Sequence, residues 1–540
     1  MRDEEQRVAA EAGPTQATGR GEKSEEQSRS LPLWLVVVAV LALGGVVVLI
    51  IYGYLEKPQW IGVADKKFWD FLDLLIVPAA LALGVYWLNL RQEIEREATE
   101  EALKERDLVV ENRRAQDVAL QAYLDKMSQL LIDKERPLHR ADPGDKLSTV
   151  ARARTLTVLS RLDGDRKRSV LEFLYESGLV VMGHEVVVLR EADLGNASLS
   201  EANLSTANLS EATLSGADLS GADLSSAILS ETNLTSAILS SATLSKATLS
   251  KATLSEATLS EATLSKAKLG EANLTGANLT GANLIGAILS SAILREADLS
   301  RANLSSAILS SAILREAKLI GTQLYRATLS EADLSGADLS SANLSGAILS
   351  ETNLSRATLS SANLSGADLS GTKLREASLT NAGLSEATLS GADLSGADLS
   401  SAILSSANLR EANLRGANLS RTTLSRATLS RTSLSSANLS NANLREANLS
   451  RAILTRANLR EANLSRADLS HASLFGTDLR GANLSEADLG RTEEELEQQA
   501  KSLDSTPSLE GATMPNGYKY EEWLKAKEGR RKDGENSGPS

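Results

Sequence analysis

The hydrophobic pattern is most regular between residues 191 and 490, where leucine recurs at every fifth position from Leu194 through Leu489. The 300 residues hold 300/5 = 60 copies of one unit. Alanine stands two positions before each leucine, so the unit reads A-x-L-x-x. Threonine replaces this alanine in seven units, at Thr232, Thr322, Thr352, Thr372, Thr422, Thr432 and Thr477.

A period of five excludes a helix as the basis of this pattern. Five residues advance a helix by about 500°, or about 140° net, so the leucines would form no stripe. In an extended chain, residues two apart point to the same face, and the alanine and leucine of each unit therefore share a face. The other two residues are small and polar, as in turns. The sequence predicts three-residue strands that wind into a solenoid, with coils about 4.8 Å apart.

These residues resemble the pentapeptide-repeat family, whose A-(D/N)-L-x-x pattern is matched by EADLG, EANLS, GADLS and GANLT. The resemblance implies a mainly β fold, a right-handed quadrilateral β-helix with four units per coil, or 60/4 = 15 coils over residues 189–490. Some soluble members of the family resemble B-DNA in shape and charge and bind type II topoisomerases. Flanking segments such as AYLDKMSQLLIDKERPL and SLEGATMPNG are similar to those of bacterial membrane-anchored pentapeptide-repeat proteins.

Two apolar segments predict an N-terminal transmembrane hairpin. Residues 31–54 are long enough to cross a bilayer, and they begin too late and run too long for a signal peptide. Residues 68–90 form the second predicted span, in which Asp70 and Asp73 are either headgroup-level residues or a proton relay. Residues 1–30 are polar and are expected to be a disordered tail. The protein is thus predicted to be a membrane protein with two spans, and the flanking Lys and Arg favour a cytoplasmic repeat domain.

The segments on either side of the repeat are predicted to connect and cap it. Residues 91–136 are expected to form a juxtamembrane helix. Residues 147–178 predict two short helices over the first coil, whose leucines and strand edges need a cover. At the far end, residues 491–505 predict a capping helix that begins with the spacing of a capping box. Residues 506–540 are expected to be a tail, disordered at its end.

The composition argues against several classes of function. A net charge of −13 and a pI near 5.1 do not suit general nucleic-acid binding, and no direct nucleic-acid partner is expected. With no Cys and three widely separated His, no metal, cofactor or catalytic constellation is predicted, and an enzyme is not expected. The basic residues of the two short helices either touch lipid headgroups or form a solvated face; they are Arg152, Arg154, Arg161, Arg166, Lys167 and Arg168.

The outer surface can be analysed by taking every twentieth residue. Two groups are candidate partner surfaces: an acidic column of Glu191, Glu211 and Glu231, and a β-branched patch of Ile288, Ile293, Ile308 and Ile313. Isoleucine also suits an exposed strand position without any partner, and this alternative stays open. A further column alternates in charge and is expected to neutralise itself; it contains Arg426, Glu446, Arg466 and Glu486.

Taken together, the sequence predicts a non-enzymatic, membrane-anchored structural or interaction scaffold that presents a rigid rod to an unidentified protein partner. A homo-oligomer is possible. The alternative is a DNA mimic that binds a type II topoisomerase, which would require persistent acidic columns.

Overall fold

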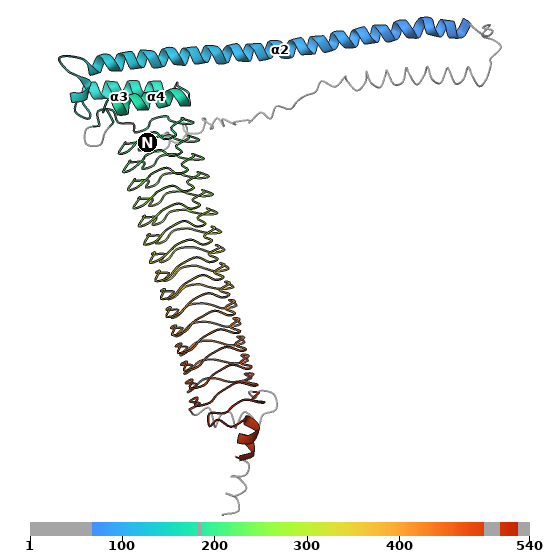
Figure 1. The fold of residues 1–540 in the computed structure, drawn as a ribbon, viewed down its shortest axis with the longest axis vertical. Coiled ribbons are helices and arrows are strands. Elements are labelled where there is room, and N and C mark those ends of the chain that lie inside the picture. The colour runs from blue at the N-terminus through green and yellow to red at the C-terminus, as the bar shows by residue number, and fades with distance from the viewer. Residues whose placement is uncertain (1–66, 181–184, 491–507, 527–540) are drawn as a thin grey trace, which may run out of the picture. The chain divides into compact units, whose positions relative to one another are not determined.

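The computed structural model describes residues 67–180, 185–490 and 508–526 (Figure 1). The chain divides into two compact units, Met1–Asp107 and Leu108–Ser540. The predicted tail at residues 1–30 and the first predicted span at residues 31–54 lie outside the described residues.

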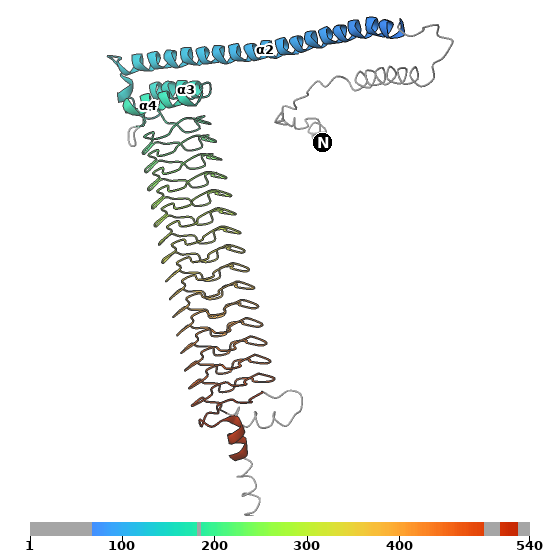
Figure 2. The same ribbon diagram turned by 45° about the vertical axis from the view of Figure 1, so that its right-hand side comes forward.

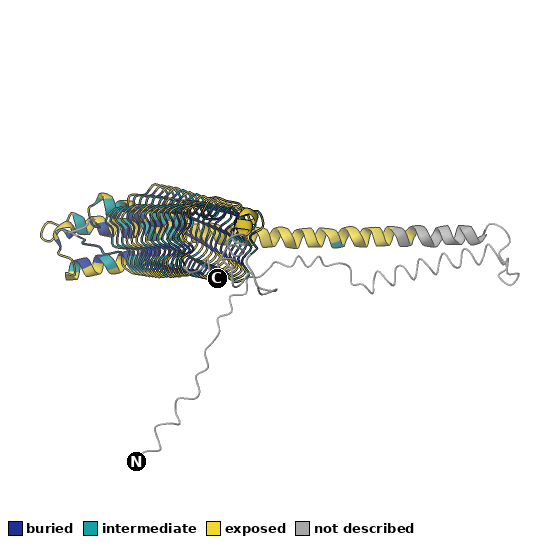
Figure 3. Ribbon diagram, turned by 90° about the horizontal axis from the view of Figure 1, so that it is seen from below, coloured by how far each residue is buried: buried dark blue, intermediate teal, exposed yellow. Residues whose placement is uncertain are grey.

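Helix α2 runs without a break over Lys67–Leu131. It joins two segments that the sequence analysis separates, the predicted span at 68–90 and the juxtamembrane helix that begins at residue 91. The helix is exposed along most of its described length (Figure 3) and carries pairs one turn apart, such as Arg91 and Glu95, at 3.0 Å between Nε and Oε1. None of the helices within the described residues is long and apolar enough to cross a membrane.

Three helices pack together at the start of the second unit. The end of α2 lies against α3 (Lys146–Leu159) and α4 (Gly164–Glu176), which follow the short helix η1 (Leu138–Arg140). Helix α4 begins where the side chain of Asp163 accepts a hydrogen bond from the backbone N–H of Arg166 at 3.2 Å, as an N-cap should. Between the helices, Met127 and Leu174 are fully buried. The two short helices predicted within residues 147–178 correspond closely to α3 and α4.

Each coil of the solenoid contains twenty residues. Parallel bridges join residues twenty apart, from Asp193 with Thr213 to Asp468 with Asp488. Within the rod, the N–H of a repeat leucine bonds to the following coil, as Leu194 N does to Thr213 O at 2.7 Å, and the N–H of the middle strand residue bonds to the preceding one, as Thr213 N does to Ala192 O at 2.9 Å. The leucine and alanine side chains are buried in the interior of the coil. The coils stack with their corners aligned along the rod in both Figure 1 and Figure 2.

The corners explain why particular polar residues recur. The second corner residue of each unit has a positive φ, for example 59° at Glu211 and 57° at Ser341. Glycine adopts this conformation without strain and occupies many of these corners, while Glu, Ser, Arg and Asn occupy others. The middle strand residue is often Asn or Asp because its side chain accepts a turn hydrogen bond two residues on. Ser205 N, for example, donates to Asn203 Oδ1 at 3.1 Å. The A-(D/N)-L pattern is therefore a turn signal as well as a packing signal.

The N-terminal helices close the first coil by replacing its missing hydrogen-bond partners. In the interior of the rod, a corner carbonyl such as that of Ser210 accepts an N–H from the preceding coil. The first coil has no coil before it. Instead, Arg152 Nη2 donates to the carbonyl of Arg190 at 2.8 Å, and Lys167 Nζ donates to the carbonyl of Gly195 at 3.0 Å. Two cationic side chains of α3 and α4 thus satisfy exposed acceptors of the first coil.

The C-terminal end differs from the prediction of a tail that begins at residue 506. The sequence separation of paired residues increases from twenty to thirty, since Asp478 pairs with Ser508 and Asn483 with Thr513. Ten extra residues therefore lie outside the coil before the chain rejoins it. Met514 occupies a leucine position and is fully buried. A short helix at residues 520–526 follows, where Tyr520 stacks on the buried Trp523. The capping helix predicted at 491–505 lies outside the described residues.

Candidate functional site

The interior of the coil offers no site for a ligand. The repeat leucines and alanines are at most 8% exposed, and no group of three His, Asp or Glu side chains that could hold a metal is found among the described residues. His139 belongs to η1 and His471 to a corner of the coil, while His184 lies outside the described residues. A molecule that binds the described coil must therefore bind its outer surface.

The isoleucine patch is brought together as the twenty-residue spacing predicts. Ile288 pairs with Ile308, and Ile293 pairs with Ile313, in neighbouring columns of the same two coils. Ile288 and Ile308 are 37% and 39% exposed, and the other two are half-buried. Whether the patch binds a partner stays a prediction, because isolated isoleucines such as Ile453, at 45%, are at least as exposed.

The patch is flanked by further apolar residues that the sequence analysis did not include. Ile285 occupies a corner on the same coil as Ile288 and is exposed, as are Ile320 and Tyr325 about two coils further on. These residues could have been recognised in the sequence because they depart from the repeat. Nearly all the remaining units have a small or charged residue at that corner.

The acidic column occupies three successive corners, and its first two members have local counter-charges. Arg190 reaches both Glu191, at 3.5 Å, and Glu211, at 2.5 Å. Arg152 adds a longer contact to Glu191 at 3.8 Å. Glu231 has no ion-pair partner among the described residues. The column is therefore less negative near the first coil than its three carboxylates indicate. Its role as a partner surface stays a prediction.

The same column becomes basic at the far end of the rod. Its last three members, Arg431, Arg451 and His471, line a shallow groove of about 380 Å³ together with Arg410, Ser430, Ser450, Asp468 and Ser470. Arg451 and His471 have no ion-pair partner within the described part of the chain. The prediction from the sequence names only the first three members of this column, all of them glutamate, and therefore misses the reversal of sign further along it.

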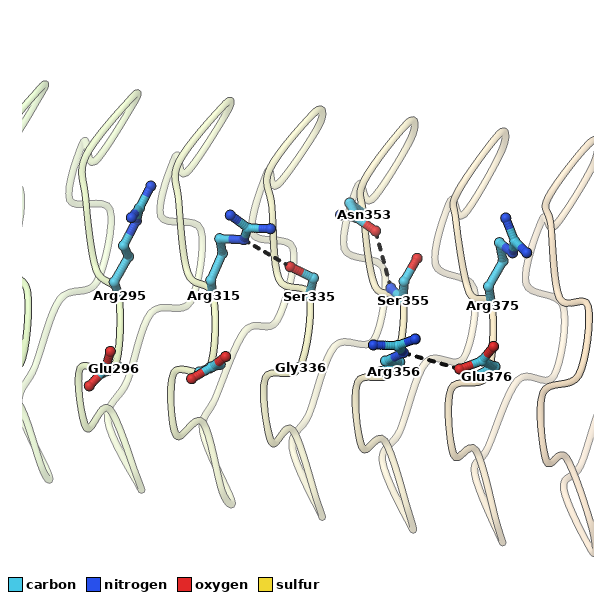
Figure 4. Close-up of a pocket in the computed structure, with 11 residues that line it drawn as sticks. Arg295, Glu296, Arg315, Ser335, Gly336, Asn353, Ser355, Arg356, Arg375 and Glu376 are labelled. Carbon is cyan, nitrogen blue, oxygen red and sulfur yellow. Dashed lines mark hydrogen bonds and ion pairs between the residues drawn. The ribbon is translucent and has the colours of Figure 1, made fainter.

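A larger groove of about 740 Å³ crosses the middle of the rod (Figure 4). Its centre is low because Ser335, Gly336 and Ser355 interrupt a ladder of larger corner residues. On one side Arg315 donates to Ser335 Oγ at 3.2 Å, and on the other Arg356 pairs with Glu376 at 3.1 Å. The groove is open and lined by both charges. Such a surface suits polar contacts with a macromolecule better than enclosure of a small molecule.

The predicted self-neutralising column is confirmed by its contacts. Arg426 Nε lies 2.8 Å from Glu446 Oε2, and Arg466 Nε lies 2.8 Å from Glu486 Oε2. The hydrogen bond from Arg426 lowers the pKa of Glu446 below its usual value. This column contributes solubility and register to the rod rather than a free charged surface.

A family described as "Pentapeptide repeats (8 copies)" matches nine stretches between residues 188 and 491, some of which overlap. No curated protein matches the sequence. HetL, a pentapeptide repeat protein involved in heterocyst differentiation regulation from the cyanobacterium Nostoc sp., shares 36% identity; the match covers 46% of this chain and 91% of HetL, with a TM-score of 0.18.

Two further solved structures are similar. The plasmid-mediated fluoroquinolone resistance protein QnrB1 is 17% identical, over 39% of this chain and 96% of QnrB1, with a TM-score of 0.20. A pentapeptide repeat protein of the Arabidopsis thaliana thylakoid lumen is 25% identical, over 26% of this chain and 84% of that protein, with a TM-score of 0.13.

Proposed function

This chain belongs to the pentapeptide-repeat family, with a right-handed β-helix as its fold, and we propose that it is a non-enzymatic scaffold that presents the rod's outer surface to a protein partner. The observation that carries the proposal is the filled interior. Every repeat leucine, with the alanine or threonine two residues before it, is buried, so that only the outer columns are available to other molecules. The rod is covered at both described ends, by α3 and α4 and by residues 508–526.

The proposal includes attachment to a membrane through residues 31–54 and 68–90. The first segment supports this by its length and apolar composition, and the second forms part of helix α2. A chain that lacks residues 31–90 should move from the membrane pellet to the supernatant after alkaline extraction, while the full chain stays in the pellet. If both chains extract alike, residues 31–90 are not the anchor. Protease protection of the repeat domain in sealed vesicles then tests the proposed cytoplasmic side.

Partner presentation can be tested by photo-cross-linking in intact cells. A photoreactive residue at Ile288 should yield a discrete cross-linked product if the isoleucine patch contacts a partner. The matched control is Ile453, which is equally a middle strand residue and is exposed but lies outside the patch. The same product from both positions would show contact without a defined surface, and no product from Ile288 would remove the patch as a partner site.

A DNA mimic that binds a type II topoisomerase receives less support. Such mimicry needs a sustained acidic surface, whereas the column that starts at Glu191 changes to Lys251 after three coils and ends in Arg431, Arg451 and His471. Inhibition of DNA gyrase supercoiling by the second unit, residues 108–540, would favour this alternative over the scaffold, and a lack of inhibition would remove it.

A further inference from the structure

Along one edge of the rod, the charged residues are ordered so that two antiparallel copies of the edge would place opposite charges face to face. This edge, here called the Glu191 edge, consists of the positive-φ corner residues at every twentieth position from Glu191 to His471. Each of them stacks on the next through the coil register. The members are Glu191, Glu211, Glu231, Lys251, Glu271, Ser291, Ser311, Glu331, Glu351, Gly371, Gly391, Glu411, Arg431, Arg451 and His471.

The pattern reverses sign about Glu331, the eighth of the fifteen members. If a second copy runs antiparallel along this edge, residues whose numbers sum to 662 face each other. The facing pairs of charged or titratable residues are then Glu191 with His471, Glu211 with Arg451, Glu231 with Arg431, and Lys251 with Glu411. Between them, each remaining position has Ser or Gly on at least one side, except Glu331, which faces its own copy on the axis.

From this complementarity we propose that two copies of the chain associate side by side and antiparallel along the Glu191 edge. Both partners have the same coil spacing, because they are the same chain, so the charges stay in step along the whole rod. A two-fold arrangement uses the same surface twice, as most homodimers do. The groove at Arg431, Arg451 and His471 of one copy receives the glutamates near the first coil of the other. This association does not depend on membrane attachment.

Other arrangements place like charges together. A parallel pair sets Glu211 against Glu211 and Arg451 against Arg451. An antiparallel pair shifted by one coil sets Glu231 against Glu411 or Lys251 against Arg431, depending on the direction of the shift. Like charges that face each other at an interface are unfavourable. The proposed register has one such contact, Glu331 with its own copy, against three kinds of oppositely charged pair, whereas a one-coil shift keeps at most two of these kinds. The charge balance therefore favours one orientation and one register.

The other edges of the rod lack this repeated complementarity. On the edge that starts at Asn196, the same antiparallel reversal sets Glu296 against Glu376. On the edge that starts at Thr206 it sets Lys266 against Arg426. The edge that starts at Glu201 has one pair of opposite charge, Glu261 with Arg421, where the Glu191 edge has three and a histidine pair.

The Glu191 edge also retains charges that are not neutralised within the chain. Glu231 and Arg451 have no ion-pair partner among the described residues. The residues that face them in the proposed pair also have contacts within the chain, Arg431 with Glu411 at 3.2 Å and Glu211 with Arg190 at 2.5 Å. Each facing pair therefore contributes one charge that has no ion-pair partner in its own chain.

The absence of native cysteine allows a direct test of orientation in the full chain in detergent. A chain with Glu211→Cys, mixed with a differently tagged chain with Arg451→Cys, should form a disulfide between the two on mild oxidation. The matched control is Ser241→Cys mixed with Asn441→Cys, two corner positions of the edge that starts at Glu201, which are also placed symmetrically about its middle. This control should give no disulfide. Dimers of Glu211→Cys with itself would show a parallel pair, and a failure of the mixed pair to cross-link would likewise overturn the proposal.

A charge exchange tests the same pairs without cysteine. Arg451→Glu should weaken dimerisation at least about tenfold, measured by sedimentation equilibrium of the full chain at low salt, since two pairs per dimer become repulsive. The double variant Glu211→Arg with Arg451→Glu restores opposite charges between the copies and should recover the dimer in part, because Arg190 then lies beside an arginine within the chain. Both residue types already occur at corners of positive φ, so that folding, checked by circular dichroism, should be unchanged. A monomeric wild-type chain, or a double variant no better than the single one, would contradict the proposal.

Discussion

The hydroxyl of Thr232 donates a hydrogen bond to the carbonyl oxygen of Leu209, 23 residues earlier and one coil away, at 2.8 Å. The threonine replaces a repeat alanine, is fully buried and ties two coils together inside the rod. Five of the other six threonines at this position make the same contact, at 2.9 Å in each case: Thr322, Thr352, Thr372, Thr432 and Thr477. The hydroxyl of Thr422 bonds to Leu419 of its own coil instead.

Replacing Thr232 by valine keeps the shape of the side chain but removes this hydrogen bond. We expect a loss of about 1 kcal/mol in the local stability of the coil, because Leu209 O keeps its second donor, the N–H of Ala212. Hydrogen exchange of the amides in that coil measures the loss. Thr232→Ser retains the hydroxyl and should exchange more slowly than the valine variant. Equal exchange in the two variants would show that the bond contributes little.

The corner residue Ser341 has a φ of 57°, a region that a β-branched side chain tolerates poorly. We expect Ser341→Val to destabilise the rod by about 1–2 kcal/mol, and Ser341→Gly to be close to neutral because relief of the left-handed conformation is offset by added freedom of the unfolded chain. Thermal unfolding compares the two. Thr358→Val, in the middle of a strand, is the control and should be tolerated; an equal loss there would point to the added valine and not to φ.

The side chain of Lys167 is only 6% exposed, and its ammonium group bonds to the carbonyl of Gly195 and to Asp193. Lys167→Met should leave that carbonyl without its donor, at a cost of about 1–3 kcal/mol. The predicted result is faster hydrogen exchange in the first coil and unchanged exchange near residue 400. The control is Arg168→Met, since Arg168 pairs with Glu172 of its own helix. Exchange that is unaltered by Lys167→Met would mean that the cap does not depend on this contact.

Burial raises the pKa of Tyr123 from 10.0 to about 12, against a smaller opposing effect of its 2.8 Å hydrogen bond with Thr155. A raised pKa in the folded chain means that ionisation favours the unfolded state. The contribution is therefore fully present below pH 10 and is lost between about pH 10 and pH 12, by roughly 2–3 kcal/mol. Unfolding of the helical cap across this range should be steeper for the wild type than for Tyr123→Phe. Parallel pH profiles would contradict the assignment.

Exchange of the four patch isoleucines for serine should leave folding intact, because serine already occupies middle strand positions such as Ser378 and Ser433. If the patch binds the partner, the product cross-linked in cells should disappear in this variant. Serine at four isolated isoleucines serves as the control, at Ile238, Ile348, Ile403 and Ile453. Loss of the product in both variants would show a general effect on the rod, and its retention in the patch variant would exclude the patch.

The sequence predicts the coil well because the physical signal is local and repeated. Leucine and alanine two residues apart indicate the buried face of every strand, and the two small or polar residues after each leucine indicate every corner. The same dependence on a fixed period explains why the pattern does not predict that the chain rejoins the coil at Leu509 and Met514. The departure of ten extra residues breaks the period, and methionine replaces the expected leucine. Leu509 and Met514 are therefore buried like the repeat leucines, but they do not stand at the five-residue spacing from which burial is predicted.

The surface is less accessible to prediction because it depends on side chains that reach between coils. The charge of Glu211 is offset by an ion pair with Arg190, 21 residues earlier, and the first coil is closed by side chains of Arg152 and Lys167. In the sequence, nothing distinguishes Arg190, Arg152 and Lys167 from the other Arg and Lys residues of the surface. The distances that join them become apparent only when the coil of twenty residues is placed in space.

The twenty-residue coil also sets how such a protein can change in length. Twenty codons are sixty nucleotides, so duplication or loss of sixty nucleotides within the gene lengthens or shortens the rod while every later residue keeps its column. A change of fifteen nucleotides adds or removes one unit and rotates all later columns by one face. Reading frame and hydrophobic packing survive both events, but only the first preserves the surface. Selection on binding faces would therefore favour rods that differ by whole coils.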